Sequence, residues 1–501
     1  MAQTTVASTV DETHAWLLDF AERQARPGAV GVAADATGRR RPRLSFAGGS
    51  DHPLGTRPYL LLADLPWPHR RPDSGPVWPR LAATLQATVG VQRFEPRGAY
   101  NPHRAMPSPR SCFPTEAFLL TPTGTWYVDP ARHALRAVGD PPAAAPSETV
   151  ERHGGAVVAL MAHLPSLPPG YVELRWALCL MEGGHAVSLM AEVAAALGLA
   201  PRVRLELAPS ALIGLASAFA ESLDDWIPLA VVELGRVRAQ AVRPWTDGVP
   251  DRPPKIDVGE APAGEADPVL QADRLTWDPT PAEAPADVDP PRSHVQPPDR
   301  GGLTWAEILF ARNAGRGNKG FTPSPERLPQ PALVDALRAT RRRPDWLPAA
   351  IWREVRLLAA VERVDDLADG LYEFSGEDAD AQPRLVAPGR LMAAVQAAWG
   401  YPITAMNVQG CNAALLLVVD YARILRCGGG WALRSVQLAL GAMFQAGGLA
   451  LTPYSAFLRP TRSYDTDRLA DPMRLAPGET VAYLGLVGRS RFADLLLDVR
   501  R

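Results

Sequence analysis

Lysine is almost absent from this chain. Lys255 and Lys319 are the only two lysines among 501 residues, so a mechanism that needs a catalytic lysine has only these two candidates. Arginine carries most of the positive charge: Lys and Arg total 52 against 54 Asp and Glu, which leaves a formal net charge of −2. Without an excess of either sign, we expect binding neither to nucleic acid nor to an anionic membrane.

Cysteine is scarce as well. The four cysteines form no C-x-x-C pair, so we expect neither a disulfide framework nor a zinc site, and a reducing compartment suits the chain: Cys112, Cys179, Cys411 and Cys427. The N-terminal residues lack a basic stretch followed by an apolar run, and the apolar run at 413–419 is too short to span a bilayer. We therefore expect a soluble, cytoplasmic protein.

Common catalytic signatures are missing too. The sequence contains no H-E-x-x-H, no G-x-S-x-G and no G-x-x-x-x-G-K-[ST], and no two histidines are four residues apart. We therefore expect no metal site, no hydrolase nucleophile elbow and no Walker A loop. Gly315, Gly317 and Gly320 match G-x-G-x-x-G, but they follow a predicted helix rather than a strand, so a dinucleotide-binding motif is weakly supported.

The length suits two or three domains, and composition indicates where they divide. Residues 251–300 hold 11 prolines and 11 acidic residues against 5 basic ones, which is typical of an extended linker or surface excursion. We expect an N-terminal half at 1–250, which carries a Pro/Arg-rich insertion at about 39–80, and a C-terminal half at 301–501.

The two halves share an order of features. Each has a strand, a turn and a second strand, at 114–138 and 352–376. Each then has a long apolar helix that ends in Gly-Leu, followed by another apolar strand; the helices are at 176–199 and 431–449, and the following strands at 203–207 and 481–488. This repeat of about half the chain indicates a duplicated domain rather than a solenoid.

Four segments carry residues suited to a ligand. A Pro-Ser loop, 98–116, offers rigid backbone and a serine hydroxyl, although a tight connection also needs prolines. An Arg/Gly loop, 310–328, suits a phosphate, although charge runs are usually solvated faces. The other two are the exit from the second long helix, 448–457, and the end of the last apolar strand, 485–491.

These segments, taken in order, resemble the SagB-type dehydrogenases of the FMN-dependent nitroreductase superfamily. The best match is RAMPSPRSCFPTEAFLLTPTGTWYVDPARHAL, 104–135, and Glu182, Gly184 and His185 extend it. The second half resembles the superfamily more loosely. The resemblance implies an α+β fold of two nitroreductase-like halves, each a mostly antiparallel sheet flanked by helices, which together form an intrachain pseudo-dimer.

The resemblance also implies FMN, held at one complete site made by both halves. The first half retains the family's Pro-Ser loop and the second half its basic loop, whereas each lacks a clear counterpart of the other. The implied phosphate ligands are Arg312, Arg316, Lys319, Arg489 and Arg491, with Arg316 and Lys319 both open as the innermost cation. The implied ring contacts are Pro107, Ser108, Arg110, Pro453, Ser455 and Ala456.

The implied activity is oxidation of azolines to azoles in a ribosomally made precursor peptide, together with cyclodehydratase partner proteins. The Lys-Tyr pair that the family often uses as its catalytic group is missing here. Four residues remain as candidates for the base, each with an alternative structural role: His163, Tyr171, His103 and Tyr100. Two other functions stay open, a NAD(P)H-dependent nitro- or ene-reductase and a scaffold subunit without flavin.

Overall fold

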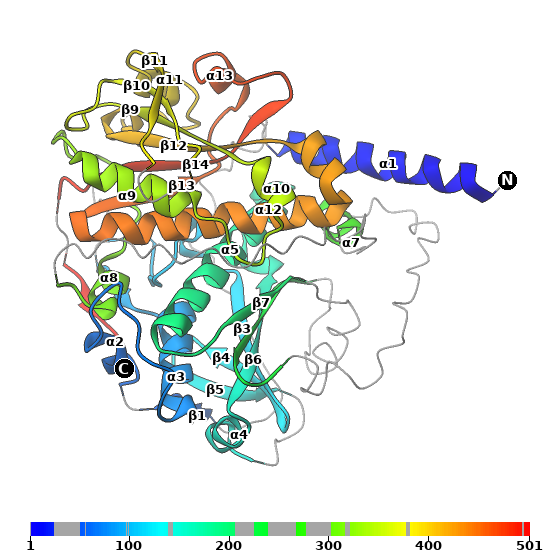
Figure 1. Ribbon diagram of the computed structural model, residues 1–501, viewed down its shortest axis with the longest axis vertical. Helices are drawn as coiled ribbons and strands as arrows, with labels where there is room; N and C mark the ends of the chain where they lie inside the picture. The colour runs from blue at the N-terminus through cyan, green and yellow to red at the C-terminus, as the bar shows by residue number, and fades with distance from the viewer. Residues whose placement is uncertain are drawn as a thin grey trace.

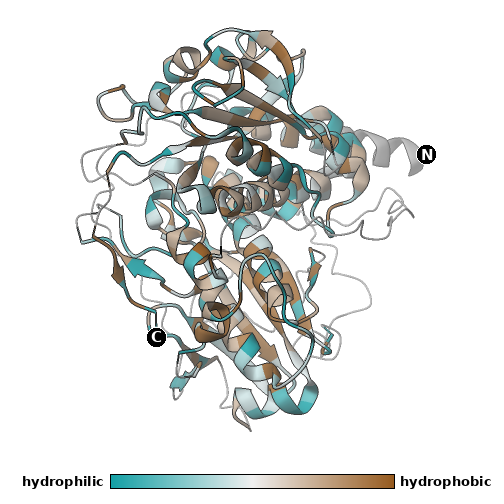
Figure 2. Cartoon of the chain, turned by 60° about the vertical axis from the view of Figure 1, so that its left-hand side comes forward, coloured by the Kyte–Doolittle hydropathy of each residue, from teal (hydrophilic) through white to brown (hydrophobic). Residues whose placement is uncertain are grey.

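Two antiparallel sheets lie on opposite sides of two long central helices, α5 (Leu174–Ala196) and α12 (Tyr421–Leu451) (Figure 1). Buried residues of both halves form one hydrophobic cluster that includes both helices, and Figure 2 colours stretches of the strands and helices as hydrophobic. The computed structural model describes residues 2–24, 51–55, 57–96, 98, 100–138, 144–205, 225–238, 267–276, 302–315, 321–376, 381–492 and 495–500.

The two central helices are apolar around most of their surface, and both are buried between the sheets. Most residues of α5 are buried on every side, because apolar and small residues surround its axis. Helix α12 is long and apolar enough to cross a membrane, but 94% of its most apolar stretch is buried inside the fold. Its helical geometry is interrupted at Gly428 and Gly429. Both long helices that the sequence predicted are thus confirmed.

The first sheet has seven strands in the order β1-β5-β4-β3-β6-β8-β7, all paired antiparallel. Helix α3 (Val77–Val89) packs against α5, and helix α4 (Pro146–His153) precedes β6 in the chain. The strands are β1 (Asp51–Pro53), β3 (Thr115–Thr121), β4 (Gly124–Asp129), β5 (Ala134–Val138), β6 (Gly155–His163), β7 (Arg202–Arg204) and β8 (Trp226–Gly235).

The second sheet repeats this arrangement with six strands in the order β11-β10-β9-β12-β14-β13, and α9 packs on α12 as α3 packs on α5. The strands are β9 (Arg356–Val361), β10 (Gly370–Glu373), β11 (Arg384–Pro388), β12 (Ala413–Asp420), β13 (Ala456–Thr461) and β14 (Glu479–Arg489). The helices are α9 (Gln330–Arg341), α10 (Ala349–Arg353), α11 (Met392–Ala397) and α13 (Asp467–Ala470).

The expected fold class is confirmed: the chain is α+β and its two halves form an intrachain pseudo-dimer. One correspondence between the halves was wrong, however. The strand at 203–207 was matched with the one at 481–488, but β7 has the place of β13 and β8 has the place of β14. In each half the edge strand precedes its inner neighbour in sequence; because neither β8 nor β13 was expected as a strand, the first strand after α5 was matched with the second strand after α12.

Segments of the second half also pack on the first. Helix α8 (Trp305–Ala311) lies against α2 (Leu60–Ala63), and Trp305 N donates to Leu65 O over 3.0 Å. The last strand, β15 (Leu497–Asp498), pairs with β2 (Arg93–Phe94), so the C-terminus lies beside α2 in Figure 1. At the other end of the chain, α1 (Ala2–Arg23) packs on α12.

The expected linker contains a helix, α7 (Pro268–Leu275), which composition alone did not predict. Asp267 caps it by accepting a hydrogen bond from Val269 N (2.9 Å), and proline occupies its first turn, where the missing N–H has no cost. Asp273 then pairs with the buried Arg434 of α12 (2.6 Å). The rest of residues 251–300 lies outside the described residues.

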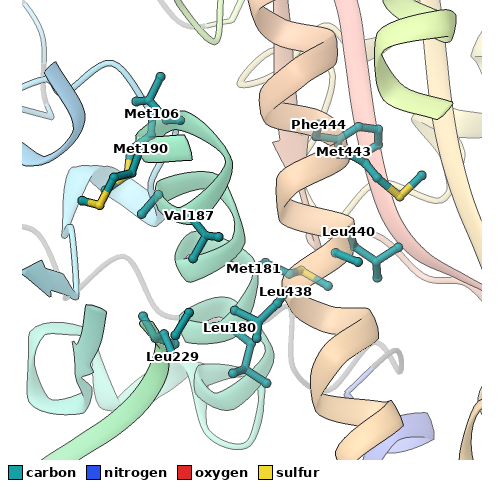
Figure 3. Packing of buried hydrophobic residues seen from close by; sticks show 14 of the residues in the cluster. Met106, Leu180, Met181, Val187, Met190, Leu229, Leu438, Leu440, Met443 and Phe444 are labelled. Atoms are coloured by element: carbon teal, nitrogen blue, oxygen red, sulfur yellow. The ribbon is translucent and has the colours of Figure 1, made fainter. Parts of the chain in front are cut away.

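The two central helices touch backbone to backbone. A Cβ added to Gly184 of α5 would lie 1.8 Å from Leu438 O of α12, and a Cβ added to Gly441 of α12 would lie 1.9 Å from Met181 O of α5. Figure 3 shows Met181 and Leu438 in the seam between the helices. The contact is reciprocal, as expected at the axis of a pseudo-dimer, and only glycine fits at either position.

We expect Gly184→Ala or Gly441→Ala to force the helices apart and to destabilise the protein by about 1–3 kcal/mol or more, because a backbone carbonyl cannot move aside as a flexible side chain can. Gly448→Ala, also on α12, is the matched control, since its Cβ would meet only Leu458 Cβ at 3.8 Å. The measurement is the midpoint of urea unfolding. Equal midpoints for Gly184→Ala and Gly448→Ala would contradict the close approach.

Candidate functional site

The Pro-Ser loop turns sharply just before β3. Ser108 is extended, with φ −146° and ψ 146°, whereas Arg110, Ser111 and Phe113 have φ values of 50°, 54° and 46°. Left-handed backbone is uncommon for residues other than glycine and needs support from its surroundings. Part of that support is a hydrogen bond from Phe113 N to Ser108 Oγ (2.8 Å), which closes the turn.

Glu182 of α5 anchors the same loop from within the core. Its Oε1 accepts a hydrogen bond from Thr115 N (3.1 Å), and the Ser108 hydroxyl is a second partner. Burial raises the pKa of the Glu182 carboxyl, although the hydrogen bonds from Ser108 and Thr115 and the charge of Arg104 act in the opposite direction. Because the Ser108 hydroxyl is committed within the fold, a ligand would meet this residue through its backbone.

Two residues of the second half also bind the Pro-Ser loop. Gln445 of α12 donates from Nε2 to Ala105 O (3.3 Å), and Arg312, at the end of α8, donates from Nη2 to Arg104 O (3.3 Å). Arg312, which was expected to bind a phosphate, is only 5% exposed. The Pro-Ser loop of one half is thus attached to two elements of the other.

His185 links α5 to the second sheet. Its Nε2 lies 3.2 Å from the hydroxyl of Tyr483 on β14. Burial, and then the charge of Arg312, lower the pKa of His185 to about 3. The imidazole is therefore neutral at physiological pH and serves as a polar connection between the halves.

The loop that leaves α12 brings together the expected second-half residues. Pro453 lies in a 3₁₀ turn, Ser455 is left-handed with φ 54°, and Ala456 begins β13 directly opposite Arg489 of β14. Arg489 donates from Nη2 to Tyr454 O (3.4 Å). Four of the predicted cofactor ligands therefore lie within one corner of the second sheet.

The arginines at this corner have unused hydrogen-bonding capacity. Arg489 Nε is buried and has no hydrogen-bond acceptor among the described residues, and Nη1 lies 3.6 Å from the carboxylate of the largely exposed Glu326. Arg491 follows two residues later with its guanidinium 5.6 Å from the Phe492 ring centroid. A buried N–H without a partner is costly, so this corner favours an anionic ligand.

Arg459, which the sequence did not point to, holds the start of the Arg/Gly loop, 310–328. Arg459 of β13 donates from Nη1 to Ala314 O (2.9 Å) and lies over the Phe321 ring at 5.1 Å. Arg316 and Lys319 lie outside the described residues.

Three tyrosines surround Arg110. Its guanidinium lies 5.7 Å from the Tyr171 ring centroid, its side chain interacts with the Tyr401 hydroxyl, and Tyr100 is close enough to influence its charge. Burial raises the pKa of Tyr171 to about 12. Tyr401 precedes β12 in the second half and belongs to no motif, so only the folded chain reveals it.

His163 lies apart from the loops described above. It ends β6, its Nδ1 is 2.9 Å from Ser166 Oγ, and its ring centroid is 4.8 Å from that of Trp226. Its neighbour Ala162 belongs to the core cluster under α5. Because side chains alternate along a strand, His163 faces the opposite side of the sheet.

His103, by contrast, lies on the Pro-Ser loop itself. Its Nε2 is 3.5 Å from Glu95 Oε2, and its backbone pairs with that of Arg93 in β2. Within the described residues, no three His, Cys, Asp or Glu side chains gather as metal ligands would.

The pseudo-symmetry relates the Arg489 corner, after α12, to the loop where α5 ends. Residues 71–80 of the chain cover that loop. Arg71 N donates to Ala196 O (2.7 Å), Arg80 Nη1 donates to Gly198 O (2.9 Å), and a Cβ on Gly198 would lie 2.5 Å from Pro72 O. The loop after α5 is therefore packed under residues 71–80, whereas the equivalent loop after α12 meets the Arg489 corner. The duplicated fold is asymmetric at these two positions.

We expect Glu182→Ala to loosen the Pro-Ser loop, because Thr115 N loses its buried acceptor at a cost of about 1–3 kcal/mol. Trypsin should then cleave after Arg110 faster than in the unchanged protein. Glu192→Ala is the matched control: Glu192 lies on the same helix and is half-buried, and its partners are Arg342 and Arg70. The proteolysis rate, followed by peptide mass, separates the two; equal rates would mean that Glu182 does not hold the loop.

Comparisons with known proteins agree with the fold. No protein-family model and no curated protein matches the sequence. The structure is similar to that of a putative nitroreductase from Anabaena variabilis, with a TM-score of 0.69 and 15% identity over 95% of this chain and 99% of that one. Two other similarities cover less of this chain. One is to the E. coli microcin synthetase McbBCD complex with truncated pro-MccB17 bound, with a TM-score of 0.30 and 13% identity over 34% of this chain and 68% of that one. The other is to a putative nitroreductase from Ralstonia eutropha, with a TM-score of 0.24 and 21% identity over 43% of this chain and 94% of that one. The chain has a nitroreductase fold along nearly its whole length.

Proposed function

We propose that the protein is an FMN-dependent dehydrogenase that oxidises thiazolines or oxazolines to azoles in a ribosomally synthesised peptide. The main support is the contact of the second half with the Pro-Ser loop of the first: Gln445 of α12 and Arg312 at the end of α8 hold that loop. The same loop begins the stretch that resembles the SagB-type dehydrogenases, 104–135. The nitroreductase fold supports the broader assignment to flavin-dependent oxidoreductases.

The residues at this site suit FMN. A dianionic phosphate needs cations and N–H donors, and the Arg489 corner offers a buried Nε that has no acceptor in the part of the chain that the structure describes. Arg491 lies next to it along the chain, Arg316 and Lys319 would add charge from the basic loop, and Arg312 would act from behind the Pro-Ser loop. The ring would lie between Pro107 and Ser108 of the Pro-Ser loop on one side and Pro453, Ser455 and Ala456 on the other.

FMN, when bound, supplies a two-electron acceptor. Oxidation of an azoline removes a proton from Cα and a hydride from Cβ, and the ring becomes aromatic. This chain therefore has to hold the ring and take the proton. Tyr171, with a pKa of about 12, keeps its own proton at neutral pH, so we assign it a donor role. Among the base candidates, we favour His103, because it lies on the Pro-Ser loop and faces the Glu95 carboxylate.

The substrate we propose is a precursor peptide, and cyclodehydratase proteins that form azolines are the partners we propose. The Pro/Arg-rich insertion at about 39–80 and the Pro-rich, acidic segment at 251–300 suit docking to such partners better than detoxification of a small molecule.

Flavin content tests the site. We expect one FMN per chain, because residues 71–80 cover the second position. Arg489→Ala combined with Arg316→Ala should lower the FMN content, since each change removes a charge-assisted hydrogen bond of about 1.5–3 kcal/mol. Arg132→Ala, on the exposed turn after β4, is the control that removes a surface cation. Flavin released by denaturation is measured against protein.

Two results would oppose this. Full flavin occupancy in the double variant would remove the phosphate assignment, and a ratio near two would mean that the position covered by residues 71–80 also binds flavin.

The reaction itself is the next test. An azoline-containing peptide should bleach the flavin absorbance and lose two hydrogen atoms by mass. His103→Gln should slow bleaching by about 10²–10⁴-fold while FMN stays bound, and His163→Gln should not, because His163 faces the other side of the sheet. If NADPH reduces the flavin but no azoline does, the protein is a reductase and the proposed dehydrogenase function is wrong. If the protein binds no flavin, the scaffold subunit is the alternative that remains.

A further inference from the structure

Two arginines near the junction of the halves lack the usual counterions. Arg110 interacts with Tyr171, Tyr401 and Tyr100, and Arg459 donates to the backbone carbonyl of Ala314. Among the described residues, no carboxylate contacts either guanidinium. Most of the other buried or half-buried arginines that the structure describes pair with an acid, as Arg434 pairs with Asp273.

The groups around Arg110 are hydrogen-bond donors. Tyr171 and Tyr401 approach it from different halves of the chain, and Tyr100 stands at the surface with 44% of its area exposed. Phenols and guanidinium groups can all donate to an oxygen, and none of them is negatively charged at neutral pH. The cluster therefore has positive potential and an opening to solvent, and no carboxylate among the described residues neutralises it.

The backbone directs Arg110 to this place. Its φ of 50° lies in the left-handed region, which a non-glycine residue rarely adopts, and Glu182 and Phe113 N hold the turn around it. Strain of this kind is commonly found where a side chain has to face a ligand. Arg459 adds charge behind the cluster, since Tyr100 and Tyr401 both influence its ionisation.

We propose that Arg110, Tyr401 and Tyr171 form a site for a substrate oxygen that carries negative charge, namely that of a carbonyl or carboxylate attached to a flat heterocycle. The inference rests on the proposed function, and it assigns Arg110 to the substrate rather than to FMN. As Cα of an azoline loses its proton to the base, the electron pair spreads onto the oxygen of the adjoining carbonyl. Donors fixed around that oxygen stabilise the charge as it develops. The charge would return to the ring as the hydride leaves Cβ; the base would hold the proton, FMN would supply the two-electron acceptor, and no further reactant is required.

The test measures binding without turnover. Isothermal titration with 2-methylthiazole-4-carboxylate gives affinity for the charged probe, and 2,4-dimethylthiazole is the neutral probe of similar shape. Arg110→Gln should weaken carboxylate binding about ten- to a hundredfold, and Tyr401→Phe should weaken it less, with binding of the neutral probe unchanged in both. Arg132→Gln and Tyr372→Phe, on the first and second sheets, are the matched controls for lost charge and lost hydroxyl.

Flavin content and unfolding midpoint accompany each variant. Lower FMN content in Arg110→Gln would mean that Arg110 binds FMN rather than the substrate, and it would overturn the proposal. Equal loss of both probes, or no loss of either, would overturn it as well, since the first indicates general disruption and the second indicates no contact.

The kinetic arm separates this proposal from the function on which it rests. If azoline peptides are oxidised, Arg110→Gln should lower kcat, because the charge on the oxygen grows towards the transition state. Oxidation with unchanged kcat and unchanged carboxylate affinity would sink the oxyanion site alone. If no azoline is oxidised yet carboxylate binding depends on Arg110, the function fails and the anion site remains.

Discussion

The close approach of α5 and α12 is the constraint on which the rest of the structure depends. Gly184 and Gly441 each face a backbone carbonyl of the opposite helix, so no side chain separates the two helices at their crossing. The distance between the two sheets follows from that contact, because each sheet packs on its own central helix. It also fixes where Glu182, on α5, and Gln445, on α12, stand relative to the Pro-Ser loop, which both of them bind. A wider crossing would separate these two anchors.

Around this axis, the duplicated fold keeps its symmetry in the core and loses it at the ends. Six strands follow the same order in each half, and the glycine contacts are reciprocal. The loops after the two central helices differ, however: one lies under residues 71–80 and the other meets Arg489. A fused chain can make this distinction because its two halves have separate sequences, whereas identical subunits would have to change both positions together.

The sequence predicted the parts of the fold that local pattern determines. The central helices and the strands before them are periodic and apolar, and they were found where expected. Relations between distant segments left no such pattern. The pairing of β15 with β2, the packing of α8 on α2 and the position of β8 between β6 and β7 all depend on tertiary contacts. Tyr401 and Arg459 were missed for the same reason: each stands alone in its own segment, and its partners come from elsewhere in the chain.

One turn of α5 shows why a short motif can carry so much of a fold. Successive residues on a helix point about 100° apart, so four of them face four directions. Glu182 meets the Pro-Ser loop, and a Cβ on Gly183 would press on Leu229 of β8 at 2.8 Å. Gly184 meets α12, and His185 meets Tyr483 of the second sheet. The turn thus joins the loop of the candidate site, its own sheet, the opposite helix and the opposite sheet. This turn therefore connects the packing of the core to the loop of the candidate site, which gives the resemblance at Glu182, Gly184 and His185 a physical basis.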